Sequence, residues 1–173
     1  MACFVLTRPL REIYHCGLMS ARPTIDALRF ARAGEICSGG VPISIFDRLH
    51  DLIADEQGSV SYRIQGEQLD GRPALRLMIE TDVHLVCQRC LGHFEQALRI
   101  DNRLPIARDE AELERWELDD PLLDVMLGDP ALDVLTLVED EILLGLPVAP
   151  HHLEGECALI GGDAVAERKM GSN

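Results

Sequence analysis

The chain has 173 residues, enough for one domain, and its 47% hydrophobic and 27% charged residues are ordinary for a soluble globular protein. No apolar run approaches the roughly 20 residues that a membrane helix needs, and charged residues interrupt the N-terminus where a secretory signal would be apolar. We therefore expect a cytoplasmic protein. The formal net charge of −14 argues against a simple nucleic-acid binder, which usually carries a basic surface.

The chain divides into an arm, a domain and a tail. Residues 1–18 are predicted to be an N-terminal arm, with Met19 as an alternative native start. Residues 19–158 are predicted to form a single domain, and residues 159–173 a flexible C-terminal tail. The domain contains an acidic segment, residues 109–133. Between Asp109 and Glu141 there are 13 acidic residues and one basic residue, whereas the rest of the chain is close to neutral.

Two short helices are expected ahead of the first long strand. Thr24 is a suitable N-cap for a helix that ends near Ala33, with Gly34 as its stop signal. Ser44 is expected to open the second helix, whose apolar stripe lies between Ile45 and Ile53.

The hydrophobic period then changes to two, which is typical of strands with one buried face. From Leu75 to Leu85 every odd position holds Leu, Ile, Thr or Val, and similar runs start at Val60 and at Phe94. Asp70-Gly71 is a strong turn signal between the first two runs. The pattern predicts an antiparallel β-meander. Its outer face mixes both signs of charge, and its weak candidates for partner contact are Arg63, Arg76 and Arg99, with Arg89 nearby.

A further helix is expected near the end of the domain. Asp133 can cap it, and it reaches about Leu146, where Pro147 ends it. A shorter helix is expected within the acidic segment, over residues 110–117. The fold class predicted is therefore α+β, an antiparallel meander with flanking helices.

Glu141 is placed unusually on this helix. On a helical projection Glu139 and Asp140 lie on the polar side, whereas Glu141 falls in the apolar arc beside Val138. A carboxylate on an apolar face needs hydrogen bonds. We expect Glu141 to face the interior and to accept hydrogen bonds from the turn at Pro150–His152 or from the nearby cysteine pair. The alternative is that it reaches solvent near the end of the helix.

Cys87 and Cys90 lie between the second and third predicted strands, and hence at a hairpin tip. Two thiolates at this spacing can face one metal ion while the amides of the turn face the sulfurs. His152 and Cys157, just beyond Pro150, would complete a tetrahedral set of three Cys and one His suited to one Zn(II). Such a site has no open ligand position, so its role would be structural.

Two other interpretations of the cysteine pair remain open. A thiol-redox pair normally begins a helix, where the dipole lowers the thiol pKa, but here a strand is expected to follow. A buried pair of free thiols, or a site that has lost its metal, also fits the spacing. The sequence contains no phosphate-binding loop, no nucleophile elbow and no His-Glu-x-x-His motif, so neither an enzyme nor a small-molecule substrate is expected.

Three motifs resemble the YceD family and occur in the family's order. They are Val86–Cys90 after the alternating run, Leu137–Pro147, and Pro150–His152 with Cys157. Members of this family are described as large ribosomal RNA subunit accumulation proteins. The resemblance covers about residues 20–158, and it places a His and a Cys of the family at His152 and Cys157. The family's Asn-Pro-Phe element and Leu- and Lys-rich tail are missing from residues 164–173.

The resemblance implies a non-enzymatic ribosome-biogenesis factor that acts in the synthesis, processing or stability of 23S ribosomal RNA. The expected partner is the large-subunit ribosomal RNA precursor, touched through a few Arg residues, or a basic ribosomal protein held by the acidic segment, or both. No membrane partner is expected. The alternative from a different class is a thiol-redox or metal-handling protein centred on Cys87 and Cys90.

Overall fold

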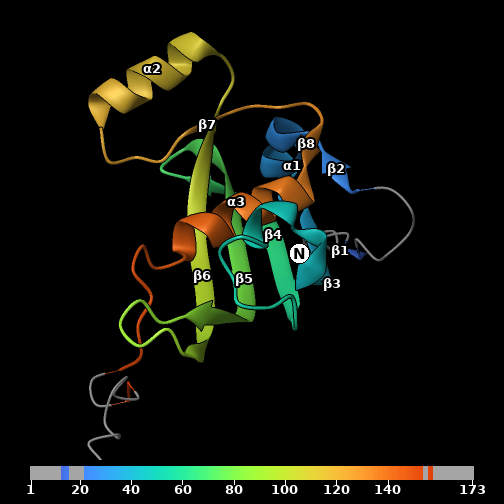
Figure 1. Cartoon of the computed structure of the whole chain (residues 1–173). Coiled ribbons are helices and arrows are strands. Elements are labelled where there is room, and N and C mark those ends of the chain that lie inside the picture. Colours follow the sequence, from blue (N-terminus) through green and yellow to red (C-terminus); the bar gives the residue numbers. More distant parts are fainter. Residues whose placement is uncertain (1–12, 16–21, 154–155, 158–173) are drawn as a thin grey trace, which may run out of the picture.

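The computed structural model describes residues 13–15, 22–153 and 156–157, and these residues form a mainly antiparallel sheet with two of the helices against one face (Figure 1). This confirms the predicted α+β class, with an antiparallel meander and flanking helices. Of the predicted arm, residues 13–15 are described, as a short strand; the predicted tail, residues 159–173, lies outside the described residues. None of the described helices is both long and apolar enough to cross a membrane.

The main sheet has the strand order β1-β3-β4-β5-β6-β7. Neighbours from β3 to β6 are antiparallel, whereas β1 and β7 pair in parallel with β3 and β6. The bounds of these strands are β1 Ile13–His15, β3 Ile36–Pro42, β4 Ser59–Leu69, β5 Arg72–Val86, β6 His93–Ala107 and β7 Met126–Leu127. The other elements are the paired strands β2 Thr24–Ile25 and β8 Leu132–Asp133, and the helices α1 Ala27–Ala33, α2 Glu110–Asp119 and α3 Val134–Gly145.

The central meander follows the predicted alternation. Asp70 and Gly71 have φ values of 52° and 80°, so they form the tight turn that joins β4 to β5. Tyr62, Ile79 and Ile100 then lie side by side across β4, β5 and β6. The odd positions of β5 are buried from Leu75 to Leu85, and they form one core with the buried sides of α1 and α3.

Helix α1 begins later than the sequence suggests. Its N-cap is Asp26, whose side chain accepts the N–H of Arg29, and the expectation of a Thr24 cap was wrong. Both residue types cap helices well, but Thr24 is paired with Asp133 in the small β2–β8 sheet. Gly34 ends the helix in the left-handed conformation, at φ 65°, as predicted.

Helix α1 packs directly on the backbone of β4. A Cβ added at Gly66 would collide with the carbonyl oxygen of Phe30, so the glycine allows this close approach. The N–H of Gly66 also donates to the carbonyl of Glu35, at 2.9 Å. Helix and sheet therefore meet here without an intervening layer of side chains.

The helix expected from Ser44 is replaced by two 3₁₀ turns, Ile43–Ile45 and Asp47–Leu49. Phe46 separates them, with φ −98° and ψ 89°, and its ring is buried. A continuous α-helix cannot contain this backbone conformation. The apolar spacing was therefore a correct signal of burial but a wrong signal of helix type.

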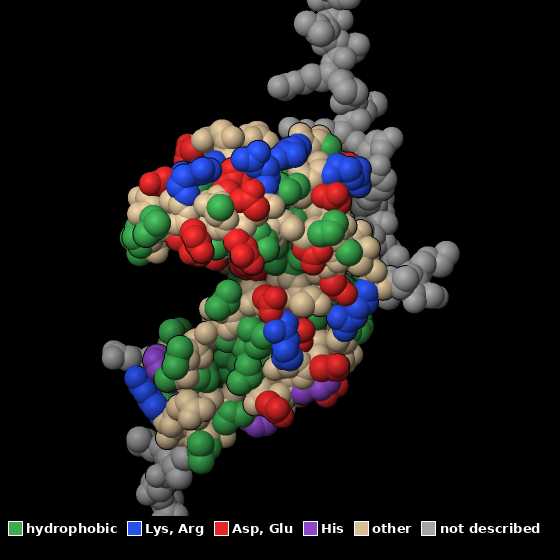
Figure 2. All heavy atoms as spheres, turned by 90° about the horizontal axis from the view of Figure 1, so that it is seen from above, with side chains coloured by type: hydrophobic (Ala, Val, Ile, Leu, Met, Phe, Trp, Pro, Cys, Tyr) green, Lys and Arg blue, Asp and Glu red, His purple; other side chains and the backbone are tan. Residues whose placement is uncertain are grey.

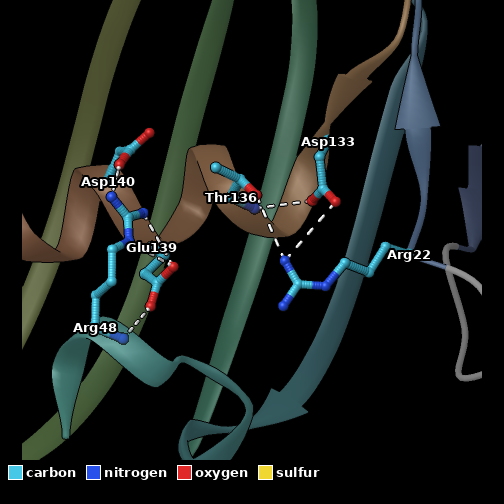
Figure 3. Close-up of polar contacts among 6 residues, drawn as sticks. All are labelled: Arg22, Arg48, Asp133, Thr136, Glu139 and Asp140. Carbon is cyan, nitrogen blue, oxygen red and sulfur yellow. Dashed lines mark hydrogen bonds and ion pairs between the residues drawn. The ribbon is translucent and has the colours of Figure 1, made fainter.

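Helix α3 begins and ends close to its predicted bounds. Asp133 caps it by accepting the N–H of Thr136, and Arg22 also contacts these two side chains (Figure 3). The predicted position of Glu139 on the polar side was wrong, because the residue is 7% exposed. Its carboxylate accepts the backbone N–H of Arg48 at 2.9 Å and pairs with the guanidinium of the same residue. The 3₁₀ turn that carries Arg48 covers this side of the helix.

Replacing Glu139 by Ala should lower the free energy of unfolding by about 1–3 kcal/mol, because the N–H of Arg48 loses its acceptor. Asp140→Ala is the matched control. It removes the other carboxylate bound by the same guanidinium, but Asp140 is half exposed, so its effect should be much smaller. Urea denaturation of the two variants measures the difference, and equal effects would show that Glu139 does not anchor the 3₁₀ turn.

Candidate metal centre

The Cys87–Gly92 segment forms the tight tip that joins β5 to β6. The N–H of Cys87 donates to the carbonyl of Gly92, and the N–H of Leu91 donates to the carbonyl of Cys87, both at 2.9 Å. The residue in the left-handed conformation is Leu91, with φ 56°. The hairpin register places the two cysteines at the end of the sheet, as the strand pattern predicted.

The segment that follows α3 brings the second half of the cluster to this tip. The carbonyl of Pro150 accepts the N–H of Gln88 at 2.8 Å, so the two segments are joined through their backbones. The ring of His152 lies against the ring of Phe94, near the start of β6, with 5.0 Å between centroids. These contacts hold His152 beside Cys90 although 62 positions separate the two residues.

The four predicted ligand residues lie together. The ligand atoms of Cys87, Cys90, His152 and Cys157 are all within 4.8 Å of one another. The Sγ atoms of Cys87 and Cys157 are 3.7 Å apart, and Nδ1 of His152 lies 3.3 Å from Sγ of Cys90 and 3.8 Å from Sγ of Cys157. Ordinary zinc bond lengths in a tetrahedron require about 3.8 Å between sulfurs and about 3.6 Å between sulfur and nitrogen. The cluster therefore has the dimensions of a zinc site.

The neighbouring histidine is directed elsewhere. His151 is exposed, and its Nδ1 lies 3.0 Å from the carbonyl oxygen of His152. Of the two adjacent histidines, His152 is thus the one whose ring nitrogen faces the three sulfurs.

The three thiols of this cluster cannot ionise independently. Burial opposes ionisation of Cys87, but N–H donors from Cys90, His152 and Arg89 outweigh it and lower the pKa of Cys87. Burial and the two neighbouring sulfurs raise the pKa of Cys157. Without a cation, one thiolate at this site therefore disfavours the next. A divalent ion would remove this conflict, because it stabilises thiolates as its ligands.

Glu141 has a different role from the one predicted. It is buried, at 5% exposed, but its carboxylate accepts the side-chain amide of Asn102 at 3.2 Å, so the expected bonds from Pro150–His152 or the cysteine turn were wrong. Asn102 lies in β6 opposite Leu77, on the face that packs against α3. Burial raises the pKa of Glu141, and the negative charges of Asp124 and Asp140 add to this effect.

Sequence reasoning missed Asn102, although a signal was present. Apolar residues occupy the even positions of β6 at Leu98, Ile100 and Leu104, and Asn102 interrupts them. Glu141 interrupts the apolar arc of α3 in the same way. Two polar interruptions on facing elements indicate a buried hydrogen-bonded pair.

The four arginines proposed for partner contact do not form one group. Arg63, Arg76 and Arg99 lie on the outer face of the sheet, whereas Arg89 is exposed at the hairpin tip. Arg76 binds Asp101 through two hydrogen bonds, and Arg99 lies 3.5 Å from the carboxylate of Asp82. Ion pairs therefore compensate much of the positive charge on this face.

Replacing Glu141 by Gln should change how stability depends on pH. The raised pKa of Glu141 means that the folded state favours its protonated form, so this stabilising contribution is lost as pH rises above about 4.5. The Gln variant keeps an acceptor for Asn102 and cannot ionise, so its stability relative to the parent should increase from about pH 4 to about pH 7. Urea denaturation across this range measures the difference. Glu141→Leu is the control, because it removes the acceptor and should be destabilising even at low pH; parallel pH profiles for Gln variant and parent would contradict the assignment.

Comparisons with known proteins agree with the motifs found in the sequence. The family model described as "Large ribosomal RNA subunit accumulation protein YceD" matches residues 75–171, a stretch that begins in β5 and contains all four cluster residues. A protein of this name from Haemophilus influenzae is 26% identical over 147 residues, which cover 82% of this chain and 82% of the relative. No solved structure matches the chain.

Proposed function

Because the chain belongs to the YceD family, we propose that it supports the accumulation of large-subunit ribosomal RNA. In this proposal it is a cytoplasmic, non-enzymatic factor that acts in the synthesis, processing or stability of 23S ribosomal RNA. The observation that carries the proposal is the family match over residues 75–171, which spans most of the hairpin, α3 and the cysteine–histidine cluster.

A structural rather than catalytic cluster is consistent with this function. Three sulfurs and one nitrogen supply all four positions of a tetrahedral zinc site, so no position is left for water or substrate. The redox alternative has less support, because β6 rather than a helix follows Cys90. We therefore propose that Cys87, Cys90, His152 and Cys157 hold one Zn(II), which would fasten residues 150–157 to the hairpin tip.

The purified protein is expected to contain one zinc per chain, measured by elemental analysis under reducing conditions. Cys87→Ser and Cys157→Ser should each release the metal and lower the melting temperature, because structural zinc contributes directly to folding. His151→Ala is the matched control, since His151 is adjacent but its Nδ1 lies against a carbonyl oxygen. Zinc-free parent protein with unchanged stability in chelator would exclude the metal site.

The distribution of charge bears on the partner. Acidic residues predominate in residues 109–133, which contain α2. On the sheet, by contrast, ion pairs compensate the positive charge of several arginines. Tight contact with RNA requires clustered cations that neutralise phosphates. The charges therefore favour a basic ribosomal protein as the direct partner, through which the chain would be linked to the ribosomal RNA precursor.

A strain that lacks the chain should contain less 23S relative to 16S ribosomal RNA, and the parental gene should restore the ratio. Quantitative analysis of total RNA measures this. Affinity purification of the tagged chain then separates the two kinds of partner, since a contact with ribosomal proteins should persist after RNase treatment. A normal ratio of the two RNAs in the deletion strain would refute the proposed function.

A further inference from the structure

One long edge of the main sheet lacks a partner strand within the described part of the chain. Strand β6 pairs with β5 from His93 to Pro105, but on its other side β7 pairs only with Ile106 and Ala107. An exposed strand edge presents unpaired N–H and C=O groups and is a template for another strand.

Two side-chain contacts show which residues of β6 face this free edge. The N–H of Arg103 donates to the side-chain oxygen of Asn102, at 2.8 Å, and the carbonyl of Ala97 accepts the side-chain amide of Gln96, at 3.1 Å. These backbone groups therefore point away from β5. In an antiparallel strand, the backbone groups of successive residues point alternately toward and away from the neighbouring strand. The backbone N–H and C=O groups of Arg99 and Asp101 therefore also point away from β5.

The next residue in this series is proline. Pro105 lies two residues after Arg103, so its backbone also points away from β5. A proline at this position therefore removes no hydrogen bond to β5, because the N–H that it lacks would face away from that strand. From Ala97 to Arg103 the edge thus presents N–H and C=O groups in the pattern that a pairing strand requires. Two of these groups are bonded only to the side chains of Gln96 and Asn102, which an incoming strand can replace.

The core is also incomplete along this edge. Phe94 and Ile100 of β6 are only half-buried, whereas their direct neighbours in β5, Leu85 and Ile79, are buried. On α3, which packs over β6, Leu144 is 76% exposed. A further strand beside β6 would cover the exposed sides of Phe94 and Ile100.

Figure 2 shows that the molecular surface is deeply hollowed on its left side, and β6 lies toward the same side of the sheet in Figure 1. Acidic side chains line the upper rim of this hollow in Figure 2, and hydrophobic ones gather along the lower part. The negative charges of Asp124 and Asp140 help to raise the pKa of Glu141, whose carboxylate is bonded to Asn102 of β6. Negative charge therefore lies close to the edge itself.

The basic residues of β6 do not balance this charge. Arg99 lies beside Asp82, and Arg103 binds Glu67 at 2.9 Å, so both are already in ion pairs on the outer face. Within the described residues, several acidic side chains of the α2 region have no such pair: Glu110, Glu114, Glu117, Asp119 and Asp120. An extended segment with basic side chains complements this surface, whereas the phosphates of RNA would be repelled.

We propose that the edge of β6 between Ala97 and Arg103 binds an extended basic segment of a protein partner by β-strand addition. Main-chain hydrogen bonds to Ala97, Arg99 and Asp101 supply affinity, and the acidic rim selects basic side chains. The proposal rests on the proposed function in one respect, since it describes how a basic ribosomal protein would be held.

The test uses proline to block the edge without disturbing β5. Ala97→Pro removes an outward N–H at an exposed position, and Ala97→Val is its control. Arg99→Pro is the second variant, and Arg99→Ala is its control, because both lose the ion pair with Asp82 and only the proline loses the N–H. Thermal unfolding shows which variants remain folded. Because proline is placed at two independent positions, the test can be made even if one of the proline variants does not fold.

The probe is a fluorescent ten-residue peptide of alternating Arg and Val, with an alternating Glu and Val peptide as its charge control. We expect binding of the basic peptide only, weakened at least about tenfold by either proline and no more than about twofold by Val or Ala. Amide exchange at Ala97, Arg99 and Asp101 should slow in the complex. Equal binding by folded proline variants, equal binding of both peptides, or preferential binding of a 23S ribosomal RNA fragment would overturn the proposal.

The same variants separate this proposal from the proposed function. In the deletion strain, Ala97→Val should restore the ratio of 23S to 16S ribosomal RNA, and Ala97→Pro should not. If the proline variant binds the peptide normally and restores the ratio, the edge is not the docking site although the function stands. If deletion leaves the ratio unchanged, the proposed function is wrong. Peptide binding that is sensitive to proline would still show that the edge of β6 binds a basic segment.

Discussion

The register between β5 and β6 determines most of the chemistry of this molecule. Because Val86 pairs with His93, Cys87 to Gly92 must form a tight tip, and the cysteines face a common side. The same register places Asn102 opposite Leu77, on the core face beneath α3, where it binds Glu141. It also decides which backbone groups of β6 face outward. A shift by one residue would exchange the two faces of β6 and remove all three features.

The metal cluster depends on this register and on a second, distant constraint. Helix α3 ends at Gly145, where a Cβ would lie 3.0 Å from the side chain of Ile100, so the helix closely approaches β6. The chain then returns to the hairpin tip, where Gln88 binds the carbonyl of Pro150. The site is therefore assembled from two segments whose meeting requires the completed sheet and helix, and zinc would add a direct link between them.

Local patterns in the sequence predicted the elements better than their contacts. Alternation from Leu75 to Leu85, the Asp70-Gly71 turn and the Asp133 cap are local signals, and each was confirmed. The burial of Glu139 was missed because its partner, Arg48, lies 91 positions away and covers the polar side of α3. The spacing of Cys87 and Cys90 likewise identified them as candidate ligands. Whether they lie close to Cys157, however, depends on tertiary packing. Hydrophobic periodicity describes one helix or strand at a time. Contacts such as Glu139 with Arg48 depend on how two separate segments pack together.

Some of the departures from local pattern lie on β6 and on the helix that packs over it. Gln96 and Asn102 occupy core-facing positions where apolar residues would bury more surface, and Glu141 places a carboxylate against the same strand. A sequence under selection for stability alone would replace such groups, because buried polar atoms gain little and are costly when unpaired. Natural proteins keep such exceptions mainly at functional sites. Because these polar residues bond to the free edge of β6 or lie beside it, they support the proposal that this edge binds a partner.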